Sequence, residues 1–226
     1  MSCTTHTRTF KNAVYDHLAT VGKALSSSTR LEILEVLAQA PRTVDSIATE
    51  VDQSVANTSQ HLQKLKKARL VTGRRDGLHV IYSLSGKDVV EMLDQLNQVA
   101  GKHIKELEVL ATEFFGERDG LEAVDHHTLF ERIKDGSAVL IDVRPEEEYD
   151  AGHLPGALSI PIDELEAHIE SLPTDRTIVA YCRGPYCAWS ADAVTQLRAK
   201  GYDARRADVS APSWNAGDQW PDTEVF

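Results

Sequence analysis

The chain has 226 residues, enough for one large domain or two of ordinary size. It has no apolar stretch of about 18 residues and no signal-peptide pattern at its start, so we expect neither a membrane span nor secretion. The chain has three cysteines, and an odd number is not typical of a secreted protein held together by disulfides. The expected location is therefore the cytoplasm, where an accessible cysteine is typically reactive or redox-sensing.

The net charge of −11 is divided unevenly. Residues 1–116 hold 14 Lys and Arg against 13 Asp and Glu, a net of +1, whereas residues 117–226 hold 10 against 22, a net of −12. Residues 60–75 contain six basic residues and no acidic one. A local basic stripe governs phosphate binding more than the total charge does. The uneven division of charge between the two halves indicates two domains with different functions.

In the first half, the pattern predicts helices followed by a β-hairpin. Apolar residues recur at helical spacing over 10–25, and a serine and threonine cap candidate opens a second helix that ends at Pro41. Two further helices, 43–51 and 54–70, are joined by a short turn at 52–53. In 70–84, β-rich runs flank Asp76–Gly77, a dipeptide that favours a tight hairpin turn. A long helix over 86–115 closes this half.

In the second half, short apolar runs alternate with helices. The runs are 138–143, 157–161, 177–181 and a weak strand at 203–207, and the helices are 145–151, 163–172 and 187–201. This alternation predicts a parallel sheet with helices on both faces. We therefore expect one domain over 1–115, a linker over 116–121 and a second domain over 122–226.

The order helix, turn, helix and hairpin is that of a winged helix-turn-helix, whose second helix lies in the major groove of DNA. On helix 54–70, Val55, Thr58, Leu62 and Leu65 share one side and should pack inward. The other side of this helix and the wing, which is the hairpin over 70–84, carry polar and basic groups suited to base edges and phosphates. The expected DNA-binding residues are Ser54, Ala56, Asn57, Gln60, His61, Gln63, Lys64, Lys67, Arg74 and Arg75.

Residues 10–100 resemble the ArsR family of bacterial repressors, through "LSSSTRLEILEVL", "SVANTSQHLQKLKKARLV" and "GRRDGLHVIYSL". The resemblance implies double-stranded operator DNA as the partner and a homodimer formed through the first and last helices. Helix 43–51 lacks the cysteine pair of one metal site of the family. His103 and Glu106 match half of another, but Val90 and Met92 stand at its earlier positions, so no metal is expected. The alternative is a winged helix used only for protein contacts.

In "IVAYCRGPYCAWSADAV", Cys182 ends an apolar run and Cys187 opens a helix. Loop amides and a helix N-terminus favour a thiolate in such a place, so we predict that Cys182 is the reactive thiol. The sequence leaves two roles open for Cys187, a resolving cysteine that attacks a persulfide or sulfenic acid on Cys182, or a small apolar residue. The loop residues between them are Arg183, Gly184, Pro185 and Tyr186, and the arginine is expected to add positive charge.

Residues 122 to about 220 resemble a single-domain rhodanese, through "LIDVRPEEEYDAGHLPGALSIP", "VAYCRGPYCAWSADAVTQLRAKGY" and Trp214. The resemblance implies that Cys182 takes a sulfane sulfur from a donor such as thiosulfate or polysulfide, and that Asp142, Arg144 and His153 support the loop. The family commonly has an arginine where this chain has Cys187. An arginine one residue later is typical of phosphatase-type loops, but this chain has Ala188 there.

The sequence thus predicts a multidomain chain, with an N-terminal winged helix-turn-helix and a C-terminal rhodanese-like parallel sheet. The expected function is a DNA-binding transcriptional regulator, a repressor, whose operator binding changes when Cys182 reacts with sulfane sulfur or oxidants. The alternative is a sulfurtransferase of low turnover whose DNA-binding half is only regulatory. No cofactor and no membrane partner are expected.

Overall fold

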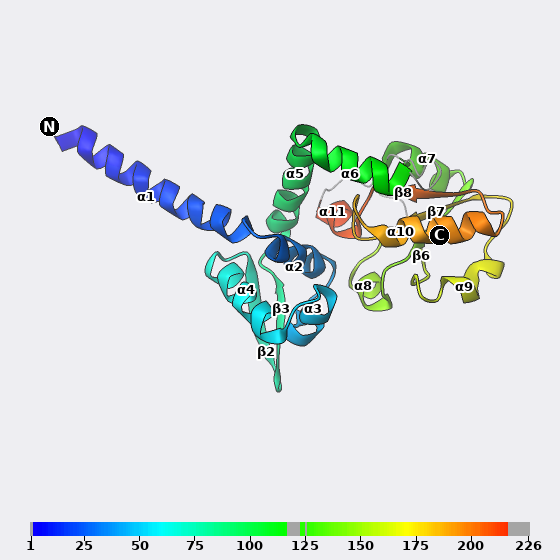
Figure 1. Ribbon diagram of the computed structural model, residues 1–226, viewed down its shortest axis with the longest axis horizontal. Coiled ribbons are helices and arrows are strands. Elements are labelled where there is room, and N and C mark those ends of the chain that lie inside the picture. Colours follow the sequence, from blue (N-terminus) through cyan, green and yellow to red (C-terminus); the bar gives the residue numbers. More distant parts are fainter. Residues whose placement is uncertain (1, 117–122, 125, 217–226) are drawn as a thin grey trace. The chain divides into compact units, whose positions relative to one another are not determined.

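A computed structural model of the chain describes residues 2–116, 123–124 and 126–216, and the side chains of 7–115, 128–129 and 131–213. Most of the expected linker, and the side chains of Cys3 and Trp214, lie outside the described residues. The chain divides into two compact units, Met1–Val89 and Val90–Phe226. A small antiparallel sheet belongs to the first unit and a parallel sheet to the second (Figure 1).

The first unit combines helices with a β-hairpin. Its elements are α1 (Ser2–Leu25), α2 (Ser28–Gln39), β1 (Arg42–Thr43), α3 (Val44–Glu50), α4 (Val55–Lys67), β2 (Val71–Asp76) and β3 (His79–Leu84). The sheet order is β1-β3-β2, and all pairs are antiparallel. Because Asp76 pairs with His79, the two-residue turn is Gly77–Leu78, where Gly77 has a φ of +58°. The predicted hairpin is confirmed, with its turn one residue later.

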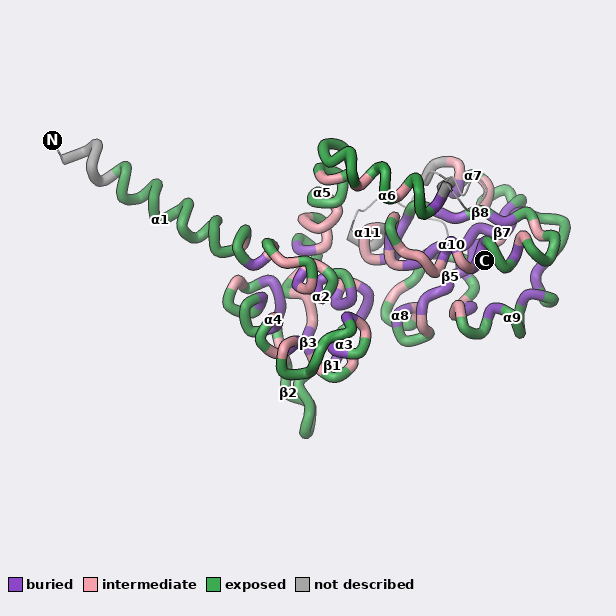
Figure 2. Tube along the Cα trace, in the orientation of Figure 1, coloured by how far each residue is buried: buried purple, intermediate pink, exposed green. Residues whose placement is uncertain are grey.

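The core of the first unit lies between α2, α3 and α4 (Figure 2). Its fully buried side chains include Ile33, Leu34, Ile47, Leu62 and Leu65. Arg30 is also buried, and its guanidinium donates hydrogen bonds to the carbonyl oxygens of Ala24 and Lys23 at the end of α1. The hydroxyls of Thr43 and Ser54 cap α3 and α4 by accepting from backbone amides at 3.2 Å. These contacts fix the start of each helix of the helix-turn-helix.

The second unit alternates strands and helices. Its elements are α5 (Lys87–His103, from Val90 on), α6 (Lys105–Gly116), β4 (Ala123–Val124), α7 (His126–Lys134), β5 (Ala138–Asp142), α8 (Glu146–Ala151), β6 (Leu158–Ser159), α9 (Leu165–His168), a 3₁₀ turn (Ile169–Ser171), β7 (Thr177–Tyr181), α10 (Ala188–Ala199), β8 (Ala204–Ala207) and α11 (Ala211–Ala216).

The parallel sheet has the strand order β4-β8-β7-β5-β6 and separates two apolar cores. Alternate residues of a strand face opposite sides, so Ile178 and Ala180 of β7 join one core with Leu197 of α10. Val179 joins the other core with Leu129 of α7. The predicted parallel sheet with helices on both faces is therefore confirmed.

Several helices differ from the sequence prediction. The long helix expected over 86–115 is wrong, because α5 ends at His103 and α6 begins at Lys105. Gly101 lies just before the break, and a glycine weakens a helix by its conformational freedom. Helices α7 and α11 were not predicted, and α1 begins at Ser2 rather than at residue 10. In the part of the chain that the structure describes, no helix combines the length and apolar character needed to cross a membrane.

Candidate functional site

Helix α4 lies where a helix-turn-helix presents its recognition helix. Thr58, Leu62 and Leu65 are fully buried, as the spacing predicted. Val55 was expected to pack inward but is 43% exposed. It is the first residue of α4, and helical side chains tilt toward the N-terminus, so its side chain points past the part of the helix that is packed.

The residues expected to bind DNA lie on the outward side of α4 and on the wing. Most are exposed, and Asn57 and His61 are half-buried. The side-chain amide of Asn57 donates to the Oε1 of Gln53 at 2.7 Å. Burial, then the charges of Arg30 and Lys64, lower the pKa of His61, so its imidazole is neutral at neutral pH. The exposed residues are Ser54, Ala56, Gln60, Gln63, Lys64, Lys67, Arg74 and Arg75. These groups form a polar and basic surface.

The cysteine loop, residues 182–187, connects β7 to α10. A disulfide joins Cys182 to Cys187, whose Cα atoms are 6.4 Å apart. Cys182 is 1% exposed, and Cys187 is the N-cap residue of α10. The chain turns at Gly184, where φ is +156°, a value that favours glycine. The carbonyl oxygen of Gly184 accepts a hydrogen bond of 3.2 Å from the Cys187 amide, and this bond closes the loop. The second cysteine therefore lies within bonding reach of the first.

Ser190, which sequence reasoning missed, lies next to the sulfur atom of Cys182. Its Oγ is 3.8 Å from the Sγ of Cys182, and the side chain is 1% exposed. The hydroxyl donates to the carbonyl oxygen of Cys187 at 3.3 Å. Because a hydroxyl hydrogen can rotate, it can instead donate to a thiolate on Cys182. Ser190 stands in the first turn of α10, a position from which the helix N-terminus also favours an anion.

Arg183 makes its closest contacts away from the sulfur atoms. Its Nε donates to Glu148 at 3.1 Å, its Nη2 also contacts that carboxylate, and Glu148 is fully buried. The guanidinium lies 4.5 Å from the ring centroid of Trp189. The positive charge expected to act on the thiol is thus largely compensated by Glu148. The contact instead ties the loop to α8.

Asp142, at the end of β5, and Arg144 form a buried network beside β7, the strand that leads into the loop. Both side chains are fully buried, and Arg144 donates to both carboxylate oxygens of Asp142, at 2.9 and 2.6 Å. Arg144 also donates to the carbonyl of Gly152 at 2.8 Å. Burial opposes the charged guanidinium, but the hydrogen bonds and the charge of Asp142 raise the pKa of Arg144.

Tyr181, the last residue of β7 before Cys182, belongs to the same network. Its hydroxyl donates to Asp142 and accepts from the Leu154 amide at 3.0 Å. Burial and then the charge of Asp142 raise the pKa of Tyr181 well above its ordinary value, so it stays neutral. His153, by contrast, is exposed and stacks on Tyr149 with ring centroids 3.7 Å apart. The buried members fix the end of β7, and with it the start of the loop.

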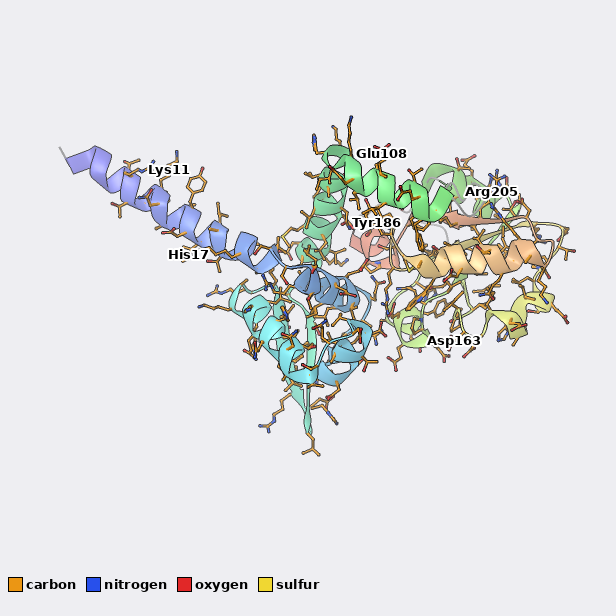
Figure 3. All side chains as sticks on the ribbon, in the orientation of Figure 1. Lys11, His17, Glu108, Asp163, Tyr186 and Arg205 are labelled. Atoms are coloured by element: carbon orange, nitrogen blue, oxygen red, sulfur yellow. A yellow bond between two sulfur atoms is a disulfide. The ribbon has the colours of Figure 1, made fainter. Side chains whose placement is uncertain are left out.

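The remaining loop residues contact two other elements. The carbonyl oxygen of Pro185 accepts a hydrogen bond of 3.0 Å from Arg206 of β8. Tyr186 is partly exposed, and its side chain lies near α5 (Figure 3). The hydroxyl oxygen is close to Gly101 of that helix, where an added Cβ atom would be 3.3 Å away from it. Burial and then the charge of Asp208 raise the pKa of Tyr186. Among the side chains that the structure describes, no three His, Cys, Asp or Glu residues are grouped as metal ligands.

Two family matches agree with this architecture. Residues 27–72 match the family described as "Bacterial regulatory protein, arsR family", and residues 125–216 match "Rhodanese-like domain". The fold and the cysteine loop thus define a class of winged-helix transcriptional regulators that carry a rhodanese-like domain.

One relative matches nearly the whole chain. It is "HTH-type transcriptional regulator Rv0324" of Mycobacterium tuberculosis, 41% identical over 204 residues, which are 90% of this chain and 89% of that protein. The chain belongs to the ArsR family of HTH-type transcriptional regulators, as a member with a C-terminal rhodanese-like domain. Both resemblances predicted from the sequence are therefore confirmed.

Other similar proteins match one half of the chain. A "Sulfurtransferase" of Allochromatium vinosum is 34% identical over 80 residues, 35% of this chain and 71% of that protein. A solution structure of the homodimeric winged helix-turn-helix DNA-binding domain of Mb0332 from Mycobacterium bovis is 40% identical, with a TM-score of 0.40, and covers 42% of this chain and 87% of that one.

Proposed function

We propose that this DNA-binding regulator responds to sulfane sulfur or to oxidants through Cys182 and Cys187, and that the state of this pair sets its affinity for operator DNA. The observation that carries the proposal is the covalent bridge between the two cysteines across the loop. A cysteine within bonding distance of a reactive thiol is the arrangement of a resolving cysteine. The apolar-residue role left open for Cys187 is less favoured by this geometry.

The proposed reaction with sulfane sulfur has two balanced steps. The thiolate of Cys182 attacks a sulfane sulfur of a polysulfide, whose S–S bond breaks and whose shortened sulfide leaves, so that Cys182 carries a persulfide. The thiolate of Cys187 then attacks the Sγ of Cys182, the persulfide S–S bond breaks, and hydrosulfide leaves. The two thiols have lost two electrons, and the sulfane sulfur has gained them as sulfide.

The DNA-binding form is proposed to be a homodimer on double-stranded operator DNA. Helix α1 exposes an apolar stripe at helical spacing, and contiguous exposed apolar surface marks an interaction site. Its members are Phe10 at 69%, Val14 at 38% and Leu18 at 60% exposure. The proposed partner of this stripe is α1 of a second copy of the chain. The two-fold symmetry of such a dimer matches that of an inverted-repeat operator.

The experiment that tests the function starts from the fully reduced protein and compares its operator affinity before and after polysulfide treatment, by fluorescence anisotropy at fixed salt concentration. We expect the dissociation constant of the wild type to change by about tenfold, equivalent to about 1.4 kcal/mol. Cys182→Ser and Cys187→Ser should lose this response, and the matched control Cys3→Ser should keep it. Equal affinities of treated and untreated wild-type protein would exclude the regulatory role of the pair.

A second candidate function is sulfur transfer, which the relative called a sulfurtransferase favours. The carrier would again be a persulfide on Cys182, released to a thiol acceptor instead of Cys187. The two functions differ in Cys187→Ser, because transfer from thiosulfate or polysulfide to cyanide or a dithiol should continue or rise in that variant, whereas the regulatory response should be lost. Cys182→Ser should abolish both.

A further inference from the structure

Arg206 of β8 connects the cysteine loop to helix α6. The side chain is 8% exposed, and its Nη1 donates to the carbonyl oxygen of Pro185 at 3.0 Å. On the other side, its guanidinium carbon lies 4.0 Å from the ring centroid of Phe115. Burial lowers the pKa of Arg206, and the charge of Asp208 opposes this. The group remains a cation, as arginine does in proteins.

Phe115 is held firmly enough to fix one face of that guanidinium. It is 8% exposed and belongs to the apolar core that contains Ile178 of β7 and Leu197 of α10. Ala111, one turn earlier on α6, packs against the same core. A partly desolvated cation over an aromatic face is stabilised by the ring. The position of Arg206 thus depends on the docking of α6 on the sheet.

We propose that Arg206 is a positioning residue for the cysteine loop, and that Phe115 positions Arg206 in turn. The inference rests on the proposed function of the loop and names how its chemistry is set. Arg206 holds the Pro185 carbonyl, and the Arg183–Glu148 pair holds the start of the loop, so the backbone is restrained on both sides of Gly184. A restrained loop keeps the two thiols close together and raises their effective concentration, which favours the bridge.

The bridge is measured by equilibrium with glutathione. Glutathione disulfide takes two electrons from the two thiols, giving the Cys182–Cys187 bridge, two molecules of glutathione and no other product. The full-length protein, without DNA, is equilibrated in glutathione buffers of graded ratio, quenched with an alkylating reagent, and its bridged fraction is read by mass spectrometry. A loss of stability that is equal in the bridged and reduced forms does not move this equilibrium constant, as long as both forms stay folded.

We expect Arg206→Met, which keeps the length of the side chain but removes the hydrogen bond, to lower the equilibrium constant for the bridge about fivefold, as one lost hydrogen bond implies. Arg206→Lys keeps a donor without the planar stacking and should have a smaller effect. Phe115→Leu should lower the constant too, and should add little in the Arg206→Met background, because the two residues act in series. The control is Arg205→Met, since Arg205 is exposed and pairs with Asp203 (Figure 3).

An equilibrium constant unchanged in both Arg206→Met and Phe115→Leu would overturn the proposal, as would equal shifts in Arg206→Met and the Arg205 control. If Arg206→Met does not fold, Arg206→Lys and Phe115→Leu decide the question by the same measurement. The outcome is separate from that of the proposed function. The bridge equilibrium can depend on Arg206 even if the bridge does not change operator affinity. Conversely, operator affinity can depend on the bridge even if Arg206 does not change the bridge equilibrium.

Discussion

Ser190 places a hydroxyl group 3.8 Å from the sulfur of Cys182, within the first turn of α10. Cys182 itself is almost fully buried, and burial disfavours any charged group. A hydroxyl donor and the amides of the helix N-terminus act in the opposite direction, because they favour the thiolate. The proposed reactivity of the reduced thiol therefore depends on its polar neighbours, and the Ser190 hydroxyl is one of them.

Replacing Ser190 by alanine should slow the reaction of reduced Cys182. Loss of one hydrogen bond to the thiolate lowers its population at neutral pH, and we expect the alkylation rate to fall about threefold. The rate is measured with iodoacetamide at pH 7, with Cys182 and Cys187 distinguished by peptide mass spectrometry. Thr195→Val is the matched control, because the Thr195 hydroxyl lies further along α10 and donates to the Ala191 carbonyl at 2.8 Å. Equal rates in the two variants would show that Ser190 does not act on the thiol.

Arg144 carries a second prediction at this scale. Arg144→Met leaves the carboxylate of Asp142 buried without its cation, although Tyr181 still donates to it. Breaking one member of a buried pair typically costs about 3–5 kcal/mol of unfolding free energy. The measurement is urea unfolding, with the exposed Arg176→Met as control. A loss below about 1 kcal/mol would mean that the network does not hold the fold together.

Among the elements, those with a clear period were predictable from the sequence and those defined by long-range packing were not. The buried face of α4 followed from the spacing of Thr58, Leu62 and Leu65, because helix periodicity is a local property. The break at Ile104 did not, because apolar spacing continues across it and only Gly101 marks the site. Helix α7 is short and its burial against the sheet is a tertiary effect.

The candidate site shows the same division. Both cysteines and the loop between them were found from the sequence, because they are neighbours along the chain. The Pro185–Arg206 hydrogen bond spans 21 residues and the Arg183–Glu148 pair spans 35, so no local pattern reveals either. Ser190 lies eight residues after Cys182 in the sequence. Its position in the first turn of the predicted helix was the signal that could have identified it as a neighbour of the thiol.

For the winged helix, the exposed basic residues predict the salt dependence of DNA binding. Lys64 lies on α4 and Arg75 on the wing strand β2, and both are exposed. Replacing either by alanine should weaken operator binding and reduce the slope of log affinity against log salt by about one unit for each lost phosphate contact. Lys200→Ala, an exposed lysine of the rhodanese-like fold, is the control. Wild-type slopes in both test variants would contradict the DNA-binding surface assigned to α4 and the wing.

Considered as a whole molecule, the chain carries its charge in two unlike halves, a net of +1 over residues 1–116 and −12 over 117–226. The total of −11 does not prevent DNA binding, because screening at physiological salt confines each charge to about 8 Å. Helix α5 follows the wing in sequence, yet from Val90 onward it groups with the C-terminal unit. Within that unit, the hydroxyl of Ser213 in α11 donates to the carboxylate of Asp94 in α5 at 2.8 Å.

The Asp94–Ser213 contact predicts a pH dependence of stability. Burial raises the pKa of Asp94, the hydrogen bond from Ser213 opposes this, and the charge of Glu91 adds to the rise. A raised pKa means that the fold favours the neutral acid. The stabilisation is therefore complete below the unfolded-state pKa of about 3.9 and is lost as the pH rises through the higher folded-state value.

Asp94→Asn should accordingly raise the unfolding free energy at pH 7 and have little effect below about pH 4, because asparagine stays neutral and can still accept from Ser213. Urea unfolding across this pH range measures the difference between variant and wild type. The exposed Asp163→Asn serves as control for a change of charge alone (Figure 3). An Asp94→Asn variant that is less stable than the wild type at pH 7 would show that the carboxylate is favoured in the fold, and that the contact between α5 and α11 depends on its charge.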